Sequence, residues 1–346
     1  MKSHTICAIF ISTLLAVVAS YTVYFGYTTN YTIHAFSPTS FKNQYDHGVY
    51  KYRILSKKIL LFTDKALGDS YPDDKAERRL LIMDTIASER FYYAYYYVNT
   101  FFLILVSIVL VLLLDMKGSL KMNNGEKHLV LFLVPLLICL TQYVVCPYDI
   151  SSYFFQLLVI FIYLKYSNRY YRLTLFLVCF LLVLATLNRE SSALTVSFLV
   201  LLTLCKFGIT KRSILFNTLI ITSFLATYFS LRYYITEINE QKTQNDYLSY
   251  NLFFFPQNLG IIFWVVFFYL SIVIANSQDN KIMIIIYHLA SLPYIWICFH
   301  AGYLWETRLY IPLFLGSLCF SKLDMSGFRF HPWEYLQATR IYKGLS

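Results

Sequence analysis

Seven charged side chains of the sequence combine the residue types that group-transfer chemistry needs. In chain order they are Asp46, Arg53, Asp149, Arg189, Glu190, Glu306 and Arg308. A carboxylate such as Asp46 or Glu190 can remove a proton from a hydroxyl. A guanidinium group such as that of Arg53, Arg189 or Arg308 binds phosphate through two parallel hydrogen bonds. These residue types favour a site in which a hydroxyl is activated beside a bound phosphate.

Most of these charges border short apolar runs. Asp149, the pair Arg189-Glu190 and the triplet Glu306-Thr307-Arg308 each adjoin a run of only about 13–15 residues, which as a helix is about 20–22 Å long. Such a run is shorter than the roughly 30 Å hydrocarbon core of a bilayer. Either neighbouring residues complete the spans at the inner interface, or the charges are drawn below the outer surface. A charge at mid-bilayer costs roughly 2.5–3.5 kcal/mol, so sunken charges mark candidate functional sites.

Structural roles stay open for the same residues. Asn188 or Ser191 could cap a helix, with Glu190 favoured by the helix dipole in the first turn. Asp149 could cap the helix that follows it, and Arg53 could face solvent or anionic lipid. None of these roles requires a substrate.

The remaining two regions also have structural alternatives. Glu306 and Arg308 could be interfacial charges beside Trp305. Because they are two residues apart and do not share a helix face, we do not expect them to pair with each other. Asp46 lies in a loop whose structure the sequence does not predict, and solvation alone would account for it.

The elements that must position these residues are apolar helices. The chain has 346 residues, of which 58% are apolar and 14% charged, against about 45–50% and 25% in soluble domains. We therefore predict an all-α, polytopic integral membrane protein with about ten transmembrane helices and a helical first outer loop. The predicted spans are 5–25, 98–115, 128–146, 150–166, 172–188, 191–206, 213–232, 259–276, 281–300 and 307–321.

Charge asymmetry predicts the orientation of these spans. With the N-terminus inside, the short inner loops and the tail carry fifteen Lys and Arg residues, whereas the short outer loops carry four. The net charge of +10 is then mainly a topology signal, and no nucleic-acid partner is predicted. Both termini are predicted to be cytoplasmic. We favour an uncleaved anchor over a signal peptide for the first span.

The predicted organisation has four parts: a first anchor at 1–26, an outer periplasmic loop at 27–97, a bundle of about nine helices at 98–321 and a cytoplasmic tail at 322–346. Within the loop, Tyr50–Leu67 has the pattern of an interfacial amphipathic helix. A second helix is predicted over Lys75–Tyr97, with its aromatic end at the membrane surface.

Cysteines do not indicate a metal or disulfide framework. The seven Cys are scattered singly, and the sequence has no CxxC motif and no Cys/His cluster. No metal ligand is assigned and no cofactor is predicted with certainty. A divalent cation bound by Asp149 and Glu306 stays open, as does a role of these two carboxylates in orienting hydroxyl groups of a substrate.

Four short motifs occur in an order that resembles the GT-C type of bacterial membrane glycosyltransferase. They are Tyr50-Lys51-Tyr52-Arg53-Ile54-Leu55, Tyr148-Asp149, Leu187-Asn188-Arg189-Glu190 and Glu306-Thr307-Arg308. The resemblance extends over most of the chain as a hydropathy plan. It implies a large first outer loop with catalytic acids, a membrane-embedded cavity and a polyprenyl-phosphate-linked sugar as donor.

The resemblance also implies transfer of the sugar to a hydroxyl of a glycan or lipid acceptor, at the outer face of a bacterial inner membrane. In that activity Asp46 or Glu190 is the base, and the three arginines hold the polyprenyl phosphate. The chain departs from the better-known members because its first loop has no Asp-x-Asp or Glu-x-Asp motif, Asp73-Asp74 being the nearest acidic pair. The identity of the base and any dependence on a metal are therefore open.

Other functions fit part of the same pattern. An O-antigen or capsule repeat-unit polymerase shares the span number and the outward Arg and Glu residues, but its largest outer loop usually lies later in the chain. A lipid-linked glycan flippase or transporter would place ionisable groups near the midplane, where this chain has almost none. A noncatalytic scaffold and any oligomeric state also stay open.

Overall fold

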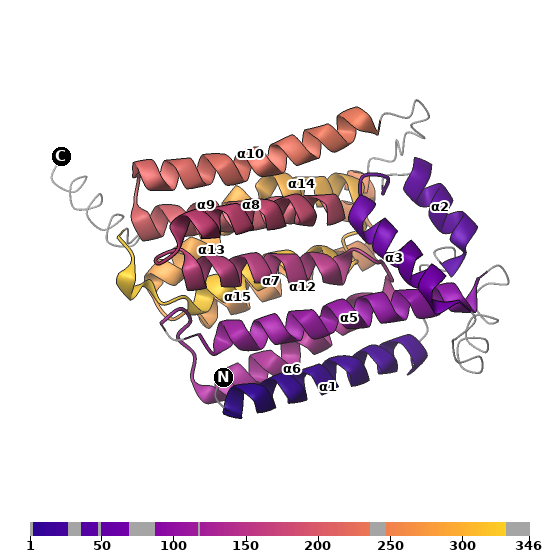
Figure 1. Ribbon diagram of the computed structural model, residues 1–346, viewed down its shortest axis with the longest axis horizontal. Coiled ribbons are helices and arrows are strands. Elements are labelled where there is room, and N and C mark those ends of the chain that lie inside the picture. The colour runs from indigo at the N-terminus through magenta and orange to yellow at the C-terminus, as the bar shows by residue number, and fades with distance from the viewer. Residues whose placement is uncertain are drawn as a thin grey trace.

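The computed structural model describes residues 3–26, 36–47, 50–68, 87–116, 118–235 and 247–329. These residues fold into helices joined by short connections, with one isolated bridge between Leu120 and Leu323 (Figure 1). The helices are α1 (Ser3–Gly26), α2 (Pro38–His47), α3 (Ile54–Leu67), α5 (Glu89–Leu114), α6 (Asn124–Leu140), α7 (Asp149–Tyr166), α8 (Tyr171–Asn188), α9 (Ser192–Phe207), α10 (Lys211–Tyr234), α11 (Tyr247–Phe253), α12 (Phe255–Val273), α13 (Gln278–Ala290), α14 (Leu292–Ala301) and α15 (Ile311–Lys322), with short 3-10 turns η2 (Thr141–Tyr143), η3 (Thr307–Leu309) and η4 (Met325–Gly327).

Six helices in the described part of the chain are long and apolar enough to cross a membrane: α1, α5, α6 with η2, α8, α10 and α12. A seventh span results when α13 and α14, which are bent by 50° relative to each other, count as one. The bend falls at Ser291, just before Pro293. Proline lacks an N–H and clashes with the preceding turn, so it interrupts a continuous helix there.

The predicted all-helical architecture is confirmed for the described residues, and their long apolar helices are compatible with a membrane protein, but the number of ten spans is not confirmed. The predicted spans 150–166, 191–206 and 307–321 correspond to α7, α9 and α15, none of which is among the six. α15 has only 12 residues, about 18 Å of helix. Its length suits a helix enclosed by neighbours rather than one that crosses a bilayer alone.

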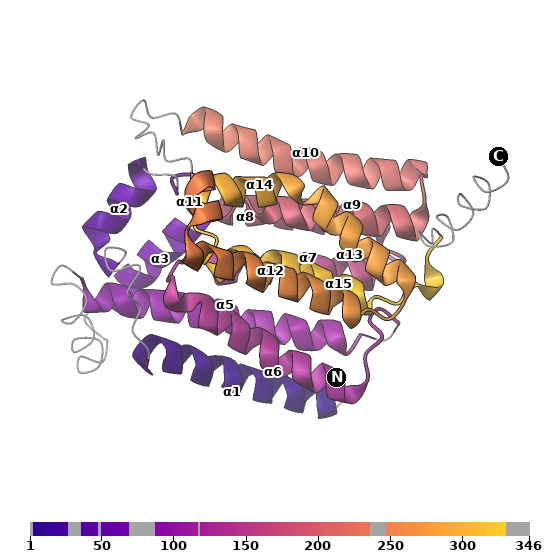
Figure 2. The same ribbon diagram turned by 180° about the vertical axis from the view of Figure 1, so that it is seen from behind.

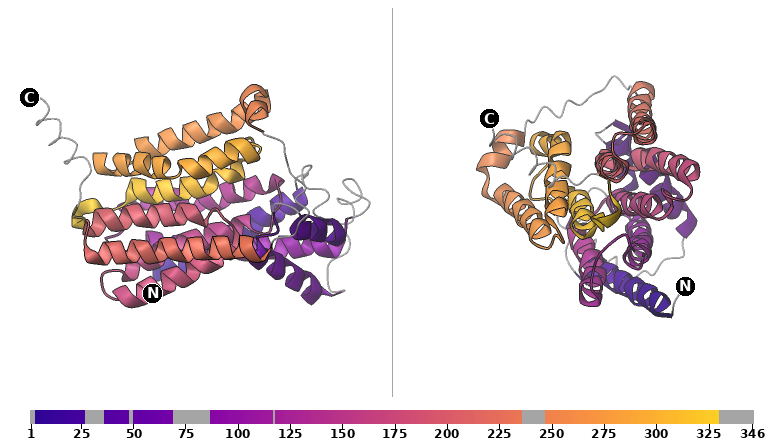
Figure 3. Two further views of the ribbon diagram at one scale, coloured as in Figure 1. Left: turned by 90° about the horizontal axis from the view of Figure 1, so that it is seen from above. Right: turned by 90° about the vertical axis from the view of Figure 1, so that its left-hand side faces the viewer.

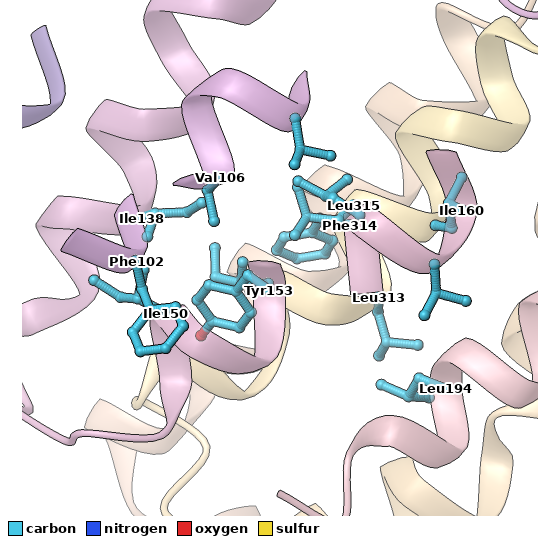
Figure 4. Packing of buried hydrophobic residues seen from close by; sticks show 14 of the residues in the cluster. Phe102, Val106, Ile138, Ile150, Tyr153, Ile160, Leu194, Leu313, Phe314 and Leu315 are labelled. Carbon is cyan, nitrogen blue, oxygen red and sulfur yellow. The ribbon is translucent and has the colours of Figure 1, made fainter. Parts of the chain in front are cut away.

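The core of the bundle lies around α7 and α15. Nearly every residue of α15 is buried, and α15 packs against α7, α9, α12 and α13. Seen end-on, this helix lies between the α12–α14 group and the α8–α10 group (Figure 3), which occupy opposite faces of the molecule (Figures 1 and 2). Side chains from α5, α6, α7, α9 and α15 meet in this interior, where Phe102, Tyr153 and Leu313 are buried (Figure 4).

The outward faces of the long helices are also apolar. On α1, Phe10 is 68% exposed and Leu14 is 54% exposed. On α12, Val265 and Tyr269 are exposed in the same way. Water disfavours such continuous exposed apolar surface, whereas hydrocarbon accepts it, so these helices have surfaces compatible with a lipid environment.

The first predicted loop differs from expectation in three ways. Asp46 belongs to α2, a helix that the sequence analysis missed and that buries Phe41 and Tyr45 against the rest of the protein. The predicted amphipathic helix begins at Ile54 rather than Tyr50. The aromatic run at 91–97 is the first part of α5 and not the end of a separate helix. Residues 75–86 of that predicted helix lie outside the described residues.

Candidate functional site

Six of the seven predicted site residues meet at one end of the bundle. α7 begins there at Asp149, α8 ends there at Asn188, and η3 precedes α15 there. Helices α2 and α3 lie at the same end (Figure 1). Because successive helices run in opposite directions, chain segments more than 150 residues apart reach the same place. The residues form two connected groups that differ in exposure.

The first group, here called the inner quartet, consists of Asp149, Arg189, Glu306 and Arg308. Asp149 lies between two guanidinium groups: Oδ1 is 2.5 Å from Arg189 Nη1, and Oδ2 is 2.9 Å from Arg308 Nη1. The Asp149 side chain is fully buried and that of Arg189 is 4% exposed. Two carboxylates and two guanidinium groups make the quartet electrically balanced, which is how a buried ionic cluster avoids an uncompensated charge.

The pairing of Glu306 with Arg308 corrects the sequence prediction. Arg308 Nη2 is 2.6 Å from Glu306 Oε2, and Arg308 Nε donates a hydrogen bond of 2.9 Å to the same oxygen. The expectation of no mutual contact assumed an α-helix. Glu306 instead precedes the 3-10 turn η3, with φ −72° and ψ 87°, and this non-helical backbone lets side chains two residues apart meet.

The second group, here called the outer trio, consists of Arg53, Glu190 and Arg232. Arg53 Nε donates a 3.3 Å hydrogen bond to Glu190 Oε2, and Arg232 Nη2 lies 3.9 Å from Glu190 Oε1. The side chains are 15%, 25% and 31% exposed in chain order, so solvent or a ligand reaches them. With two guanidinium groups and one carboxylate, the trio has one unbalanced positive charge.

Tyr148 connects the two groups. The Arg53 Cζ atom lies 3.9 Å from the centroid of the Tyr148 ring, and the Cζ atoms of Arg189 and Arg308 lie 5.5 Å and 5.9 Å from it. Arg308 Nη1 also donates a 3.2 Å hydrogen bond to the Tyr148 hydroxyl. Cations are attracted to the negative face of an aromatic ring. A single buried ring therefore positions three arginines from separate segments.

Buried polar residues hold the backbone around this site. Asn188 at the end of α8 donates a 3.0 Å hydrogen bond to the Tyr148 carbonyl and accepts one of 2.8 Å from Ser151. These bonds fix the segment before Arg189 against the start of α7. Tyr153 donates a 3.0 Å hydrogen bond to the Arg308 carbonyl. The segments that carry the inner quartet are thus held by hydrogen bonds to the backbone as well as by the ion pairs within the quartet.

A close helix–loop contact places Glu306 and Arg308. Gln257 on α12 accepts a 3.1 Å hydrogen bond from the backbone N–H of Trp305. A Cβ atom added at Gly260 would lie 1.7 Å from the Leu304 carbonyl oxygen. Only glycine permits α12 to approach this loop so closely, and the contact brings the residues after Trp305 to the start of α15.

The helix-cap alternatives are not realised in this geometry. α7 starts at Asp149 with no side-chain capping bond, and α9 starts after Ser191 with no side-chain capping bond. Asp149 contacts arginines, and Asn188 contacts α7 instead of the first turn of α9. Side-chain capping of these helices therefore does not explain why these polar residues stand where they do.

Asp46 is not part of either group. Its carboxylate forms an ion pair with Lys57 of α3. The neighbouring Tyr45 ring lies 6.4 Å from the Tyr148 ring, centroid to centroid, so α2 does pack near the site. Between the two candidate bases, Glu190 is the one that directly contacts a site arginine.

Arg232 is a site residue that sequence reasoning did not select. It lies in the last turn of α10, 42 positions after Glu190 in the chain, and its Cζ atom lies 3.5 Å from the Tyr228 ring centroid and 4.5 Å from that of Tyr52. The one signal for Arg232 in the sequence is that it stands at the end of an apolar run. In the sequence it could not be distinguished from an ordinary interfacial charge.

An apolar cavity of about 360 Å³ adjoins the outer trio. Ile54, which follows Arg53, and Leu231, which precedes Arg232, both line it. The cavity lies between α3, α8 and α10, and its other lining residues are Leu187, Ala226, Thr227, Ser230, Tyr234 and Ile235. A charged, partly exposed group and an apolar cavity side by side suit an amphiphilic ligand with a phosphate and a hydrocarbon chain.

The charge of Glu190 is stabilised by its neighbours. Burial raises the pKa of this carboxyl, but the nearby guanidinium groups of Arg53 and Arg232 and a backbone hydrogen bond outweigh burial, so the pKa lies below its usual 4.5. Glu190 is therefore ionised at neutral pH and accepts hydrogen bonds.

The described residues contain no group of three or more His, Cys, Asp or Glu that could hold a metal ion. Both carboxylates once considered for a cation, Asp149 and Glu306, contact guanidinium groups. Comparison of the chain with models of known protein families, with curated proteins and with solved structures gives no match in any of the three.

Proposed function

We propose that this protein is a membrane-embedded glycosyltransferase of the bacterial inner membrane. It takes a sugar from a polyprenyl-phosphate-linked donor and transfers it to a hydroxyl of a glycan or lipid acceptor at the outer face. The observation that supports this proposal is the outer trio beside the apolar cavity. It offers phosphate-binding guanidinium groups, a carboxylate and a hydrocarbon-binding surface within one small region.

In the proposed reaction the acceptor hydroxyl oxygen forms a bond to the anomeric carbon of the sugar. The bond between that carbon and the donor phosphate oxygen breaks, and its electron pair leaves with the polyprenyl phosphate. Glu190 accepts the hydroxyl proton. Arg53 and Arg232 stabilise the charge that grows on the phosphate as it departs. The inner quartet does not contact substrate in this scheme but holds Tyr148 and the segment containing Glu190 in place.

Donor binding also tunes the base in this scheme. Arg53 lowers the pKa of Glu190 in the unliganded protein, which makes the carboxylate a weak proton acceptor. A donor phosphate that draws Arg53 away from Glu190 raises the pKa of the carboxyl. The base then becomes stronger only when the donor is in place.

The test uses purified full-length protein in liposomes with polyprenyl-phosphate-linked sugars and labelled acceptors. We expect transfer of the sugar, at least 100-fold slower transfer by Glu190→Gln, and wild-type rates for Lys121→Gln, a control at a surface ion pair with Asp324. A ladder of repeats as product would replace the transferase with a polymerase. Movement of lipid-linked glycan across the bilayer without transfer would favour the flippase alternative.

A further inference from the structure

A basic hollow lies at the end of the bundle opposite to the inner quartet and the outer trio. There α7 ends at Tyr166, α8 begins at Tyr171 and α10 begins at Lys211. The hollow has a volume of about 550 Å³. Its lining residues are Asn168, Arg169, Tyr170, Tyr171, Arg172, Leu173 and Arg212.

The hollow concentrates positive charge without acidic neighbours in sequence. Segments 165–173 and 206–213, which form it and its surroundings, contain six Lys or Arg residues and no Asp or Glu. Within the part of the chain that the structure describes, Arg169, Arg172 and Arg212 form no ion pair. The dipole of α8 adds positive potential at its first turn. Among the described residues, the positive charge of the hollow is therefore not paired with a carboxylate.

Arg212 is held in position independently of any ligand. Its Nη2 donates a 2.7 Å hydrogen bond to the Ser167 carbonyl, and its Cζ lies 4.2 Å from the centroid of the Tyr171 ring. The Tyr171 hydroxyl in turn donates a 2.8 Å hydrogen bond to the Arg212 carbonyl. The buried Nε atom of Arg212 has no hydrogen-bond partner among the described residues. Arg212 is thus a preorganised donor, while Arg169 and Arg172 are exposed at the mouth of the hollow.

An exposed apolar strip leads from the hollow along α8. Leu173 lines the hollow and is 55% exposed, and Phe176 and Phe180 are exposed further along. Residues spaced by three and four positions lie on one helix face. A ligand that fills the hollow with a phosphate therefore has a hydrocarbon-compatible surface immediately beside it.

We propose that the basic hollow binds the phosphate of an anionic glycerophospholipid, with one acyl chain lying against the strip at Leu173, Phe176 and Phe180. Guanidinium groups match phosphate geometry, and Tyr170 and Tyr171 suit the interface at which headgroups lie. The strip distinguishes a lipid from free phosphate, which would gain nothing from it. This inference does not depend on the proposed glycosyl transfer.

The test measures lipid retention by native mass spectrometry of the detergent-solubilised full-length protein, together with its thermal unfolding. The probes are phosphatidylglycerol, phosphatidylcholine and inorganic phosphate. We expect retention and stabilisation by phosphatidylglycerol well above phosphatidylcholine. Each of Arg169→Gln and Arg172→Gln should weaken phosphatidylglycerol binding about fivefold, since one basic residue near a headgroup contributes on the order of this factor. Both residues are exposed, so these variants should fold even where Arg212→Gln does not.

Two controls decide between diffuse and specific binding. Lys127→Gln removes a base near the start of α6 at the same end of the bundle (Figure 2) and should leave binding unchanged. Phe176→Ala should weaken phosphatidylglycerol binding and leave inorganic phosphate binding unaltered. Equal losses in Lys127→Gln and Arg172→Gln, equal binding of both lipids, or inorganic phosphate binding as tightly as phosphatidylglycerol would each overturn the proposal.

Discussion

The inner quartet and the outer trio are built from the same residue types but are opposite in exposure and balance. Asp149 of the inner quartet is fully buried between two arginines, whereas Glu190 of the outer trio is 25% exposed. The charges of the inner quartet sum to zero, whereas those of the outer trio sum to one positive charge. Charges that are buried and fully paired, as in the inner quartet, hold a fixed geometry but leave no unpaired charge to bind a ligand. The outer trio is partly exposed and has a surplus positive charge, so it is able to bind phosphate.

Breaking the inner quartet should have the largest effect on stability. Arg308→Met leaves Glu306 without its cation and Asp149 with only one of its two. We expect a loss of about 3–5 kcal/mol because a buried charge loses its partner. The measurement is thermal unfolding in detergent, followed by the fraction of protein that remains monodisperse.

The double variant Glu306→Gln/Arg308→Met is the matched control. It removes the cation and the carboxylate that depends on it, and it leaves the Asp149–Arg189 pair intact. It should therefore unfold at a higher temperature than Arg308→Met alone. A double variant that is less stable than the single one would show that charge balance is not what holds the quartet together.

Breaking the outer trio should affect activity without affecting folding. Glu190→Gln keeps the shape of the side chain and one accepting oxygen, but it replaces the other oxygen with a donating NH2 group and removes the negative charge. We expect transfer to fall about 10²–10⁴-fold, the usual contribution of a general base, while the unfolding free energy changes by less than about 1 kcal/mol because partly exposed pairs contribute little. Sugar transfer and unfolding measured on the same preparation check this. A large loss of stability with intact transfer would reverse the assigned roles.

Tyr148 tests the connection between the two groups. Tyr148→Leu removes the ring that three arginines face, whereas Tyr148→Phe keeps the ring and removes only the hydroxyl that accepts from Arg308. We expect a stability loss of about 2 kcal/mol or more for Leu and about 1 kcal/mol for Phe. Unfolding measurements on both variants check the order. Equal losses would assign the effect to the hydroxyl alone.

The smallest expected effect concerns pH. The pKa of Glu190 lies below its usual 4.5 because Arg53 and its other neighbours outweigh burial. A carboxyl with a lowered folded-state pKa adds stability above its unfolded pKa, and this stability is lost as pH falls through the folded value. Arg53→Gln should raise the pKa of Glu190 and destabilise the protein by about 1 kcal/mol or less at neutral pH, with the difference vanishing at strongly acidic pH. Unfolding temperatures across this range test it, and a difference independent of pH contradicts it.

Local pattern explains which features were predictable. Apolar runs gave the positions of most helices, because a helix in hydrocarbon needs only continuous apolar length. The same criterion also selected short helices such as α15, which is enclosed by other helices and is not among the helices long enough to cross a membrane. It also missed α2, which is polar overall and is held by two buried aromatic rings rather than by its own pattern.

The sequence by itself determined that the chain is helical and apolar, and that charges stand at the borders of its apolar runs. Only the tertiary structure decided how those charges pair. Arg308 meets Asp149 across 159 positions of chain, and Arg232 joins Glu190 from the far end of α10. Ion pairing depends on distance and burial, which are set when helices pack and not by spacing along the chain. The division into a balanced interior and an accessible, positively charged exterior therefore came from packing.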